Sequence, residues 1–429
     1  MIVWKYQGIR VTPAASVWHR MIVGAVLLVT PHLAFSATTN EFERPPVLKA
    51  SDLVSPARLR GKGFQVGESV PTDGAFGLFT IKATADVFHE DAGTYQVRSR
   101  DLLELRLAEV PAIIKLDEVS KTGTFVKAMA ASGARPLEAG WNIATNPVDA
   151  VTGLPSGAGR LFDRVQTGAA NLWNAPESDE SGLKQTGTAT ADALGYEQER
   201  RTLAHQLGVD PYTSNPILAR KLDQVAWVSF AGRMTVSAAI SVAVPGSTLI
   251  SAVGAMNDLV WDTPRGDLIV RVETKLEELK VPRDQISCVS HNPAVPLSLQ
   301  VSVVDNLGRL SGVAGRAAAV RLLCAAVTES QARVLATAVR MLADYHEKKK
   351  AITAVAAHGP LIGRDRDGTL VLPAPIDYLS WTERIAAFAT NPDFLATKKR
   401  TLWVTGKVSP RARKELKANG WTVQETTSP

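Results

Sequence analysis

Residues that mark common catalytic sites are scarce in this sequence. The 429 residues include two cysteines and seven histidines, and aromatic residues make up 6% of the chain. GxSxG, HExxH, CxxC and Walker patterns are missing, and no two histidines have ligand spacing on one helix. We therefore predict no catalytic, cofactor-binding or metal-binding residues. A hydrolase built from distant residues stays open, because catalytic triads form in space rather than in sequence.

Internal repeats and disordered or fibrous compositions are also lacking. The chain is 45% hydrophobic and 21% charged, which is ordinary for a folded protein. Its length allows two or three domains and a sizeable core. The few aromatic residues disfavour a large stacking surface for bases or sugars.

The first 37 residues have the pattern of a secretory signal peptide. Three basic residues flank or precede an apolar run at 21–35, and the small residues Ser36 and Ala37 follow it. The apolar part is shorter than the roughly 20 residues that cross a bilayer as a helix. We predict cleavage near Ser36 and Ala37, which makes the mature protein periplasmic or secreted.

The two cysteines, Cys288 and Cys324, both follow this segment. In an oxidising compartment they could pair, and the chain-entropy model gives about 4 kcal/mol of stabilisation for a loop of this length. Two buried free thiols are the alternative, because spacing in sequence does not fix a distance in space.

Basic residues are in slight excess after the predicted signal peptide. That peptide carries three Lys or Arg and no Asp or Glu, so the formal net charge falls from +6 to +3 without it. For an exported protein, nucleic acid is a poor candidate partner, and we expect a protein or a cell-envelope component. Anionic lipid or polysaccharide could contact the C-terminal end, although a solvated face is the simpler interpretation. That end is locally basic through Lys398, Lys399, Arg400, Lys407, Arg411, Arg413, Lys414 and Lys417.

The pattern of apolar residues predicts an α+β protein that is mainly helical. We expect a small N-terminal antiparallel sheet, a central helical domain and a small C-terminal α/β unit. The predicted regions are the signal peptide (1–37), an N-terminal arm (38–63), a β-rich then helical region (64–134), a Gly/Pro-rich wrap and linker (135–189), a helical domain (190–350) and the α/β unit (351–429).

Local patterns refine the two ends of this scheme. Alternating apolar residues over 64–99 predict antiparallel strands, with a solvated turn at 89–91, and Pro111 interrupts the apolar stripe of the helix that follows. Near the C-terminus, strands at 350–357 and 368–376 are expected to pair across the turn between them. Residues 401–425 predict a strand, a helix and a strand.

The stretch GVDPYTSNPIL, residues 208–218, raises the question of whether it is a site or a corner between two helices. Gly208 suits the left-handed residue after a helix, and Asp210 precedes a proline and therefore avoids the helical region. Asn215 is a good N-cap, with Pro216 at the first helical position. We predict a structural helix junction at Gly208, Asp210, Asn215 and Pro216. Local chemistry assigns no role to Tyr212, Thr213 and Ser214.

Residues 234–257 contain no charged side chain, and Pro245-Gly246 lies at their middle. Each half would be about 16 Å long as a helix, roughly half of a bilayer core. A buried hairpin is the preferred interpretation, since apolar runs of this length are more often core. A hairpin that inserts into a membrane is the alternative.

These observations support three hypotheses about function. We favour an exported, non-catalytic binding or interaction module in the periplasm or at the cell surface. The second hypothesis is a membrane-active protein that inserts residues 234–257, which predicts leakage of liposomes. The third is an enzyme with an unrecognised site, which predicts a deep pocket with shifted pKa values.

Overall fold

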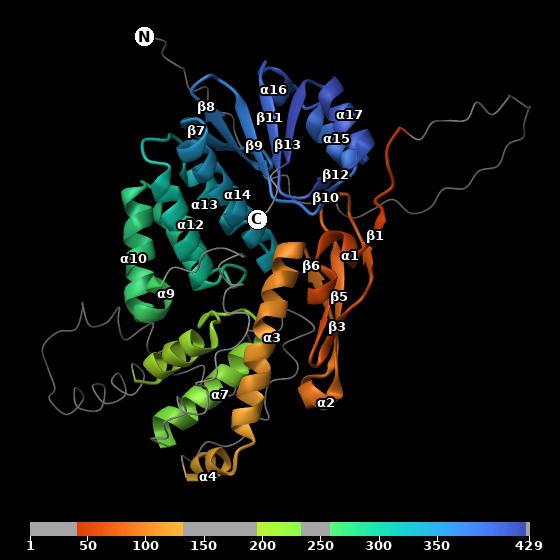
Figure 1. Cartoon of the computed structure of the whole chain (residues 1–429). Helices are drawn as coiled ribbons and strands as arrows, with labels where there is room; N and C mark the ends of the chain where they lie inside the picture. The colour runs from red at the N-terminus through yellow and green to blue at the C-terminus, as the bar shows by residue number, and fades with distance from the viewer. Residues whose placement is uncertain (1–40, 132–194, 233–257, 426–429) are drawn as a thin grey trace, which may run out of the picture. The chain divides into compact units, whose positions relative to one another are not determined.

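The computed structural model describes residues 41–131, 195–232 and 258–425, which lie, apart from residue 41, in one compact unit, Phe42–Pro429. The predicted signal peptide (1–37), the whole of the predicted wrap and linker (135–189) and the run 234–257 lie outside the described residues. The described residues form a mixed α+β fold (Figure 1), as the sequence predicts, with N-terminal antiparallel sheets, central helices and a C-terminal mixed sheet.

The N-terminal region contains two antiparallel sheets. Burial alternates along β5, where Phe79 and Ile81 face the core and Lys82 is exposed, so the period-2 pattern confirms the predicted strands. A four-stranded sheet has the order β2-β3-β5-β6 and a two-stranded sheet pairs β1 with β4. The elements here are β1 (Val47–Lys49), α1 (Ala50–Leu53), η1 (Pro56–Arg58), β2 (Arg60–Gly61), β3 (Phe64–Val66), β4 (Ser69–Pro71), β5 (Leu78–Ala83), α2 (Ala85–Phe88), η2 (His89–Asp91) and β6 (Gly93–Arg98).

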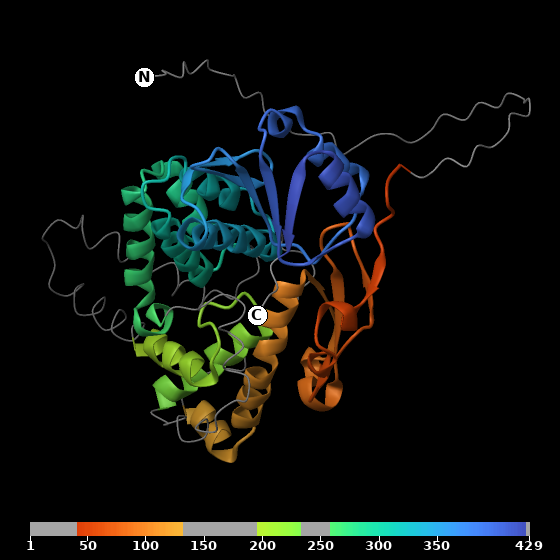
Figure 2. The same cartoon turned by 45° about the horizontal axis from the view of Figure 1, so that its top comes forward.

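One long helix, α3 (Arg100–Ser120), passes beside this sheet (Figure 2) and buries Leu103 and Leu107 against it. The helix continues without a break through Pro111. Proline removes one backbone donor, but Val110 and Ala112 are buried on either side, and their packing outweighs that loss. The helix α4 (Gly123–Ala131) follows after a short turn.

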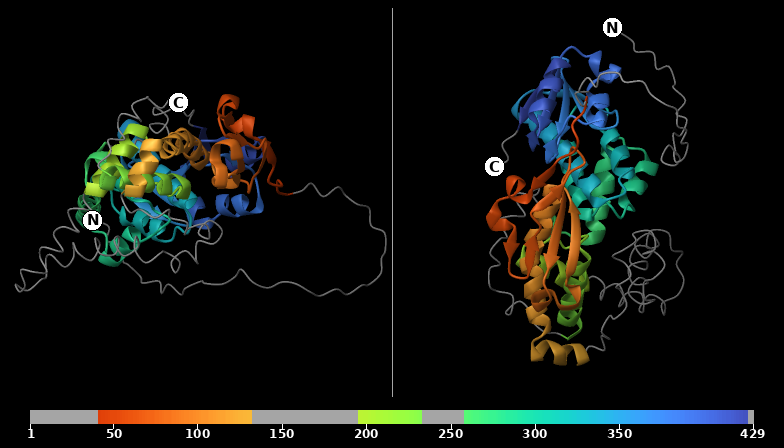
Figure 3. Two further views of the ribbon diagram at one scale, coloured as in Figure 1. Left: turned by 90° about the horizontal axis from the view of Figure 1, so that it is seen from below. Right: turned by 90° about the vertical axis from the view of Figure 1, so that its right-hand side faces the viewer.

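The helix α7 (Pro216–Gly232) packs beside α3 (Figure 3), and both contribute to one apolar cluster that includes Leu116 and Leu222. Residues 195–207 form the helix that precedes α7. A second cluster is built from helices further along the chain, with Leu268, Leu307 and Leu342 at its centre. These helices are α9 (Leu259–Asp262), α10 (Arg265–Glu278), α11 (Arg283–Ser290), α12 (Leu297–Arg309), α13 (Ala317–Cys324) and α14 (Glu329–Lys348).

The C-terminal sheet is mixed and lies between two apolar clusters. Strands β9, β11 and β13 are parallel, whereas β7, β8 and β9 are antiparallel, in the order β13-β11-β9-β8-β7. Val371 faces the central helices, and Leu372 faces the helices that follow β9. The elements are β7 (Ile352–Ala357), β8 (Leu361–Asp365), β9 (Leu370–Ala374), β10 (Tyr378–Leu379), α15 (Glu383–Ala389), α16 (Pro392–Leu395), β11 (Arg400–Val404), β12 (Lys407–Val408), α17 (Pro410–Ala418) and β13 (Trp421–Glu425).

The structure confirms the strand–helix–strand of residues 401–425 as β11, α17 and β13. The direct pairing predicted across the turn GRDRDG, residues 363–368, is wrong, because the strand β8 lies between β7 and β9. Residues of β8 pair with β7 on one side and with β9 on the other. The basic and acidic residues of Gly363–Gly368 resemble a turn in sequence, but Arg364 and Asp365 belong to the strand β8. Burial of Gly363 under Leu342 and Ile352 explains why this part of the segment is extended.

Candidate functional site

The stretch 208–216 turns the chain between two helices. Gly208 has φ +66° directly after the helix 195–207, and the amide of Val209 donates to the carbonyl of Ala204. At the other end, Oδ1 of Asn215 accepts hydrogen bonds from the amides of Ile217 at 3.1 Å and Leu218 at 3.4 Å. Pro216 is the first residue of α7. The backbone roles that we assigned to these residues are therefore visible in the geometry.

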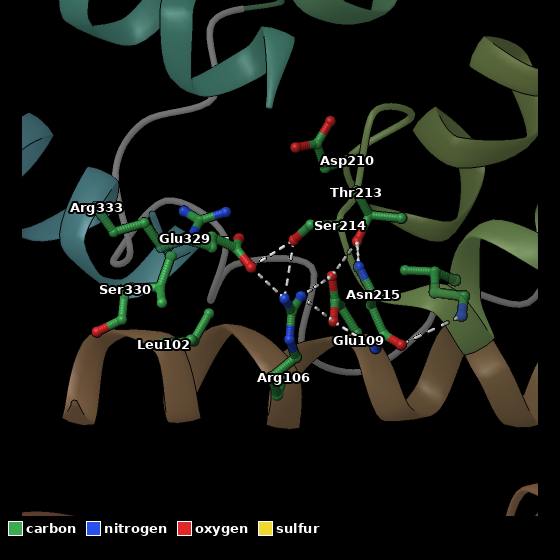
Figure 4. Close-up of polar contacts among 12 residues, drawn as sticks. Leu102, Arg106, Glu109, Asp210, Thr213, Ser214, Asn215, Glu329, Ser330 and Arg333 are labelled. Carbon is green, nitrogen blue, oxygen red and sulfur yellow. Dashed lines mark hydrogen bonds and ion pairs between the residues drawn. The ribbon is translucent and has the colours of Figure 1, made fainter. Parts of the chain in front are cut away.

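Two of the residues left without a local role, Thr213 and Ser214, bind side chains of α3 (Figure 4). Thr213 donates its hydroxyl to Oε1 of Glu109 at 2.6 Å, and the amide group of Asn215 donates to Oε2 at 2.7 Å. Arg106, one turn earlier on α3, donates to both oxygens at 3.2 and 3.0 Å. Glu109 is 2% exposed, so these four hydrogen bonds replace its contacts with water.

The same arginine reaches the beginning of α14. Arg106 pairs with Glu329 and donates to the hydroxyl of Ser214 at 2.9 Å, while that hydroxyl donates to Glu329. Glu329 also pairs with Arg333 at 2.7 Å. Burial favours the neutral carboxyl, but the two arginines outweigh it and hold the pKa of Glu329 below its usual value.

Asp210 lies at the buried end of the group. Its side chain accepts a hydrogen bond from the amide of Tyr212 at 2.7 Å and one from the hydroxyl of Ser298 on α12. Burial raises the pKa of Asp210, and these hydrogen bonds and the charge of Arg333 oppose the rise only in part. Tyr212 packs into the core of the central helices, with Arg265 over its ring.

We call these residues the junction cluster: Arg106, Glu109, Asp210, Thr213, Ser214, Asn215, Ser298, Glu329 and Arg333. Three carboxylates and two guanidinium groups come from α3, the turn and α14, which are more than 100 residues apart in sequence. Thr213 and Ser214 donate their hydroxyl protons to carboxylates. These hydrogen bonds hold the two side chains in position, but they do not activate the hydroxyls as nucleophiles in the way an adjacent imidazole does. The arrangement joins three parts of the fold.

Histidines of the described part of the chain make their contacts elsewhere. His346 accepts from the amide of Ile352, His291 contacts the carbonyl of Ser287, and His89 lies 3.4 Å from Asp117. Within residues 41–131, 195–232 and 258–425, no group of three or more His, Cys, Asp or Glu side chains could hold a metal ion. Over the same ranges, no helix is long and apolar enough to cross a membrane.

A disulfide joins Cys288 on α11 to Cys324 at the end of α13. Their Cα atoms are 5.6 Å apart, within the usual range for a disulfide. The bond closes a loop that contains α12 and therefore ties together the helices that surround the central apolar cluster. The pairing that the sequence left open against two free thiols is present in the structure.

Asp377, in the loop between β9 and β10, is a buried carboxylate that sequence analysis missed. It accepts from the amide of Gly77 at 2.9 Å and from the amide of Arg100, the first residue of α3, at 3.1 Å. Burial raises its pKa to about 6, against the opposing effect of these amides. Nothing in the local sequence signals the role, because the donors lie about 300 residues away.

Two sequence expectations about charged residues need correction. Asp91, expected in a solvated turn, is 1% exposed and pairs with Arg220, because α7 brings that arginine against the turn. Arg400, counted with the basic C-terminal end, is 8% exposed and donates to the carbonyls of Thr397 and Asn419. It therefore holds the α17–β13 connection in place and adds no charge to an open surface.

Comparison of the chain with protein-family models, with curated protein sequences and with solved structures gave no match.

Proposed function

We propose that the protein is exported and acts by binding, as a non-catalytic interaction module in the periplasm or at the cell surface. The disulfide between Cys288 and Cys324 carries the proposal of export. Such bonds persist in oxidising compartments and are rare in reducing ones. The basic, apolar and small residues of the first 37 positions support the same compartment.

The junction cluster supports binding over catalysis. Its stretch of sequence is the most distinctive in the chain, and the hydroxyls of Thr213 and Ser214 are used to hold α3 and α14. A residue that must stay in place to maintain the fold is a poor choice for a group that takes part in chemistry. We therefore place the function on an exposed surface.

Fractionation of cells that express the full-length chain tests the proposal. The mature N-terminus is sequenced, and the membrane pellet is washed with high salt and then at high pH. We expect a product that begins near residue 37 or 38, outside the cytoplasm, with an intact disulfide. A chain that stays in the cytoplasm with Met1 and two free thiols would contradict export.

Insertion of residues 234–257 into a membrane is the second candidate function. These residues lie outside the described part of the chain, but the helix that leads to them favours the idea. Trp227 on α7 is 37% exposed and contacts the rings of Tyr196 and Phe230. Tryptophan and tyrosine are enriched where proteins meet the membrane interface. Resistance of the mature chain to both washes, lost on Val244→Asp, would support this candidate over the first.

A further inference from the structure

We propose that five basic side chains at one end of the C-terminal sheet form a docking surface for anionic lipid headgroups. The inference rests on the proposed function, because an exported protein meets lipid phosphates before it meets nucleic acid. We call this surface the basic edge: Lys350, Arg364, Arg366, Lys398 and Lys399.

The topology of the sheet brings these residues together. The end of β8, the beginning of β9 and the beginning of β11 lie side by side, because the amide of Leu370 donates to the carbonyl of Lys399 at 2.9 Å. The segment before β7 joins them, since the amide of Arg366 donates to the carbonyl of Ala351 at 3.0 Å. The side chain of Arg364 on β8 reaches the segments before β9 and β11. Its guanidinium donates to the carbonyl of Gly368 and to the hydroxyl of Thr397, both at 3.4 Å.

The charges at this edge are not balanced. Asp367 is the carboxylate in contact with the group, and it pairs with Lys350 at 2.5 Å. The hydrogen bond from Lys350 and the nearby charges of Arg366 and Lys399 lower the pKa of Asp367. The buried carboxylate of Asp365 also acts on Lys350, so five cations against two anions leave a net charge of about +3 in this small region. Neighbouring positive charges attract anions more strongly than isolated ones do.

The surroundings favour lipid over other anions. Leu395, which follows Phe394 in α16 and stands just before Lys398, is 40% exposed. A solvent-facing leucine beside lysines suits the boundary between headgroups and acyl chains. The tryptophans of the same sheet, Trp403 and Trp421, are 8% and 2% exposed, so they offer no face on which bases could stack.

The test measures how the protein, purified in the form that cells accumulate, co-sediments with vesicles. Vesicles of phosphatidylcholine are compared with vesicles that also contain phosphatidylglycerol. Each basic residue near an anionic membrane contributes about fivefold to affinity. The triple variant Arg366→Glu/Lys398→Glu/Lys399→Glu should therefore bind the anionic vesicles at least about a hundredfold more weakly.

A matched control reverses three exposed basic residues on the N-terminal region, in the variant Arg44→Glu/Lys49→Glu/Lys82→Glu. It has the same net charge as the edge variant and should keep most of the binding. Equal loss in both variants, or equal binding of the wild type to both kinds of vesicle, would overturn the inference. Tighter binding to a single-stranded oligonucleotide than to vesicles, lost in the edge variant, would overturn it in favour of nucleic acid.

Two outcomes separate this inference from the proposed function. An exported protein that does not bind anionic vesicles contradicts the lipid-binding role of the basic edge but not the proposal of export. A cytoplasmic protein that binds anionic vesicles through the basic edge contradicts export and supports the surface. Folding of the edge variant is checked by urea denaturation, in which its unfolding curve should overlay that of the wild type, as expected for exposed substitutions.

Discussion

The junction cluster and the basic edge use the same kinds of side chain in opposite ways. In the junction cluster, Glu109 and Glu329 are 2% and 11% exposed on the side chain, and each carboxylate is matched by arginine and hydroxyl donors. At the basic edge, Lys398 and Lys399 are exposed, and basic residues outnumber the carboxylates beside them. Charges that are buried must be paired where they lie, whereas charges left in water stay available to a partner. The first group stabilises the fold, and we propose that the second takes part in recognition.

Removing the central carboxylate of the junction cluster should give the largest effect. Glu109→Ala leaves Arg106 short of one of its two carboxylate partners in a buried place, and deprives Thr213 and Asn215 of their acceptor. We expect the free energy of unfolding to fall by about 3–5 kcal/mol. Urea denaturation measures it, with Glu118→Ala on the exposed side of the same helix as the control. A decrease of less than 1 kcal/mol in the free energy of unfolding would contradict the stabilising role of the junction cluster.

Loss of the disulfide should come next. Cys288→Ser/Cys324→Ser opens the loop around α12, and the free energy of unfolding should fall by about 2–4 kcal/mol. Reductant should destabilise the wild type by the same amount and leave the double variant unchanged. If reductant shifts both proteins equally, the bond does not link the two helices as described.

The pH dependence of stability should follow Asp377. Its folded pKa of about 6 lies above the value for an unfolded chain, so the folded state binds the proton more tightly. Its contribution to stability is complete below about pH 4 and is lost as the pH rises through 6. Between pH 7 and pH 5 the wild type should therefore gain roughly 1–2 kcal/mol relative to Asp377→Asn. The difference between the urea midpoints of the two proteins should therefore shift in favour of the wild type on acidification, and parallel curves would refute the assignment.

Two single substitutions should give the smallest effects, and Ser214→Ala the larger of these. The substitution removes one hydroxyl but leaves the direct pair between Arg106 and Glu329. We expect a loss of about 1 kcal/mol, the usual contribution of one hydrogen bond. Arg366→Ala at the basic edge, measured in the same way, should change stability by less than about 0.5 kcal/mol. Equal losses from the two single substitutions would show that the hydrogen bonds of Ser214 add nothing to the ion pair between Arg106 and Glu329.

Roles that depend on neighbouring residues were predictable from the sequence. Gly208 and Asn215 act within three residues of their own positions, so turn and capping preferences locate them. The fold class followed in the same way from periodicity, because burial alternates along β5 and along the long helix α14, which begins after the N-cap Thr328. Local chemistry is sufficient where the partner is local.

Partners that arrive from distant parts of the chain were not predictable. The acceptors of Thr213 and Ser214 lie 104 and 115 residues away, and Asp377 meets amides about 300 residues away. One signal for the junction cluster was present, since Arg106 and Glu109 interrupt the apolar stripe of a helix that is otherwise buried there. The strand β8 was missed because its charged residues resemble a turn, and tertiary pairing on both edges decides its conformation.

Co-sedimentation with phosphatidylglycerol vesicles tests most directly whether the basic edge, rather than the junction cluster, binds a partner. Ser214→Ala and the variant Arg366→Glu/Lys398→Glu/Lys399→Glu are compared with the wild type. We expect Ser214→Ala to bind like the wild type and the edge variant to bind about a hundredfold more weakly, with its unfolding midpoint unchanged. Loss of binding in Ser214→Ala, with full binding in the edge variant, would show that recognition belongs to the junction cluster instead.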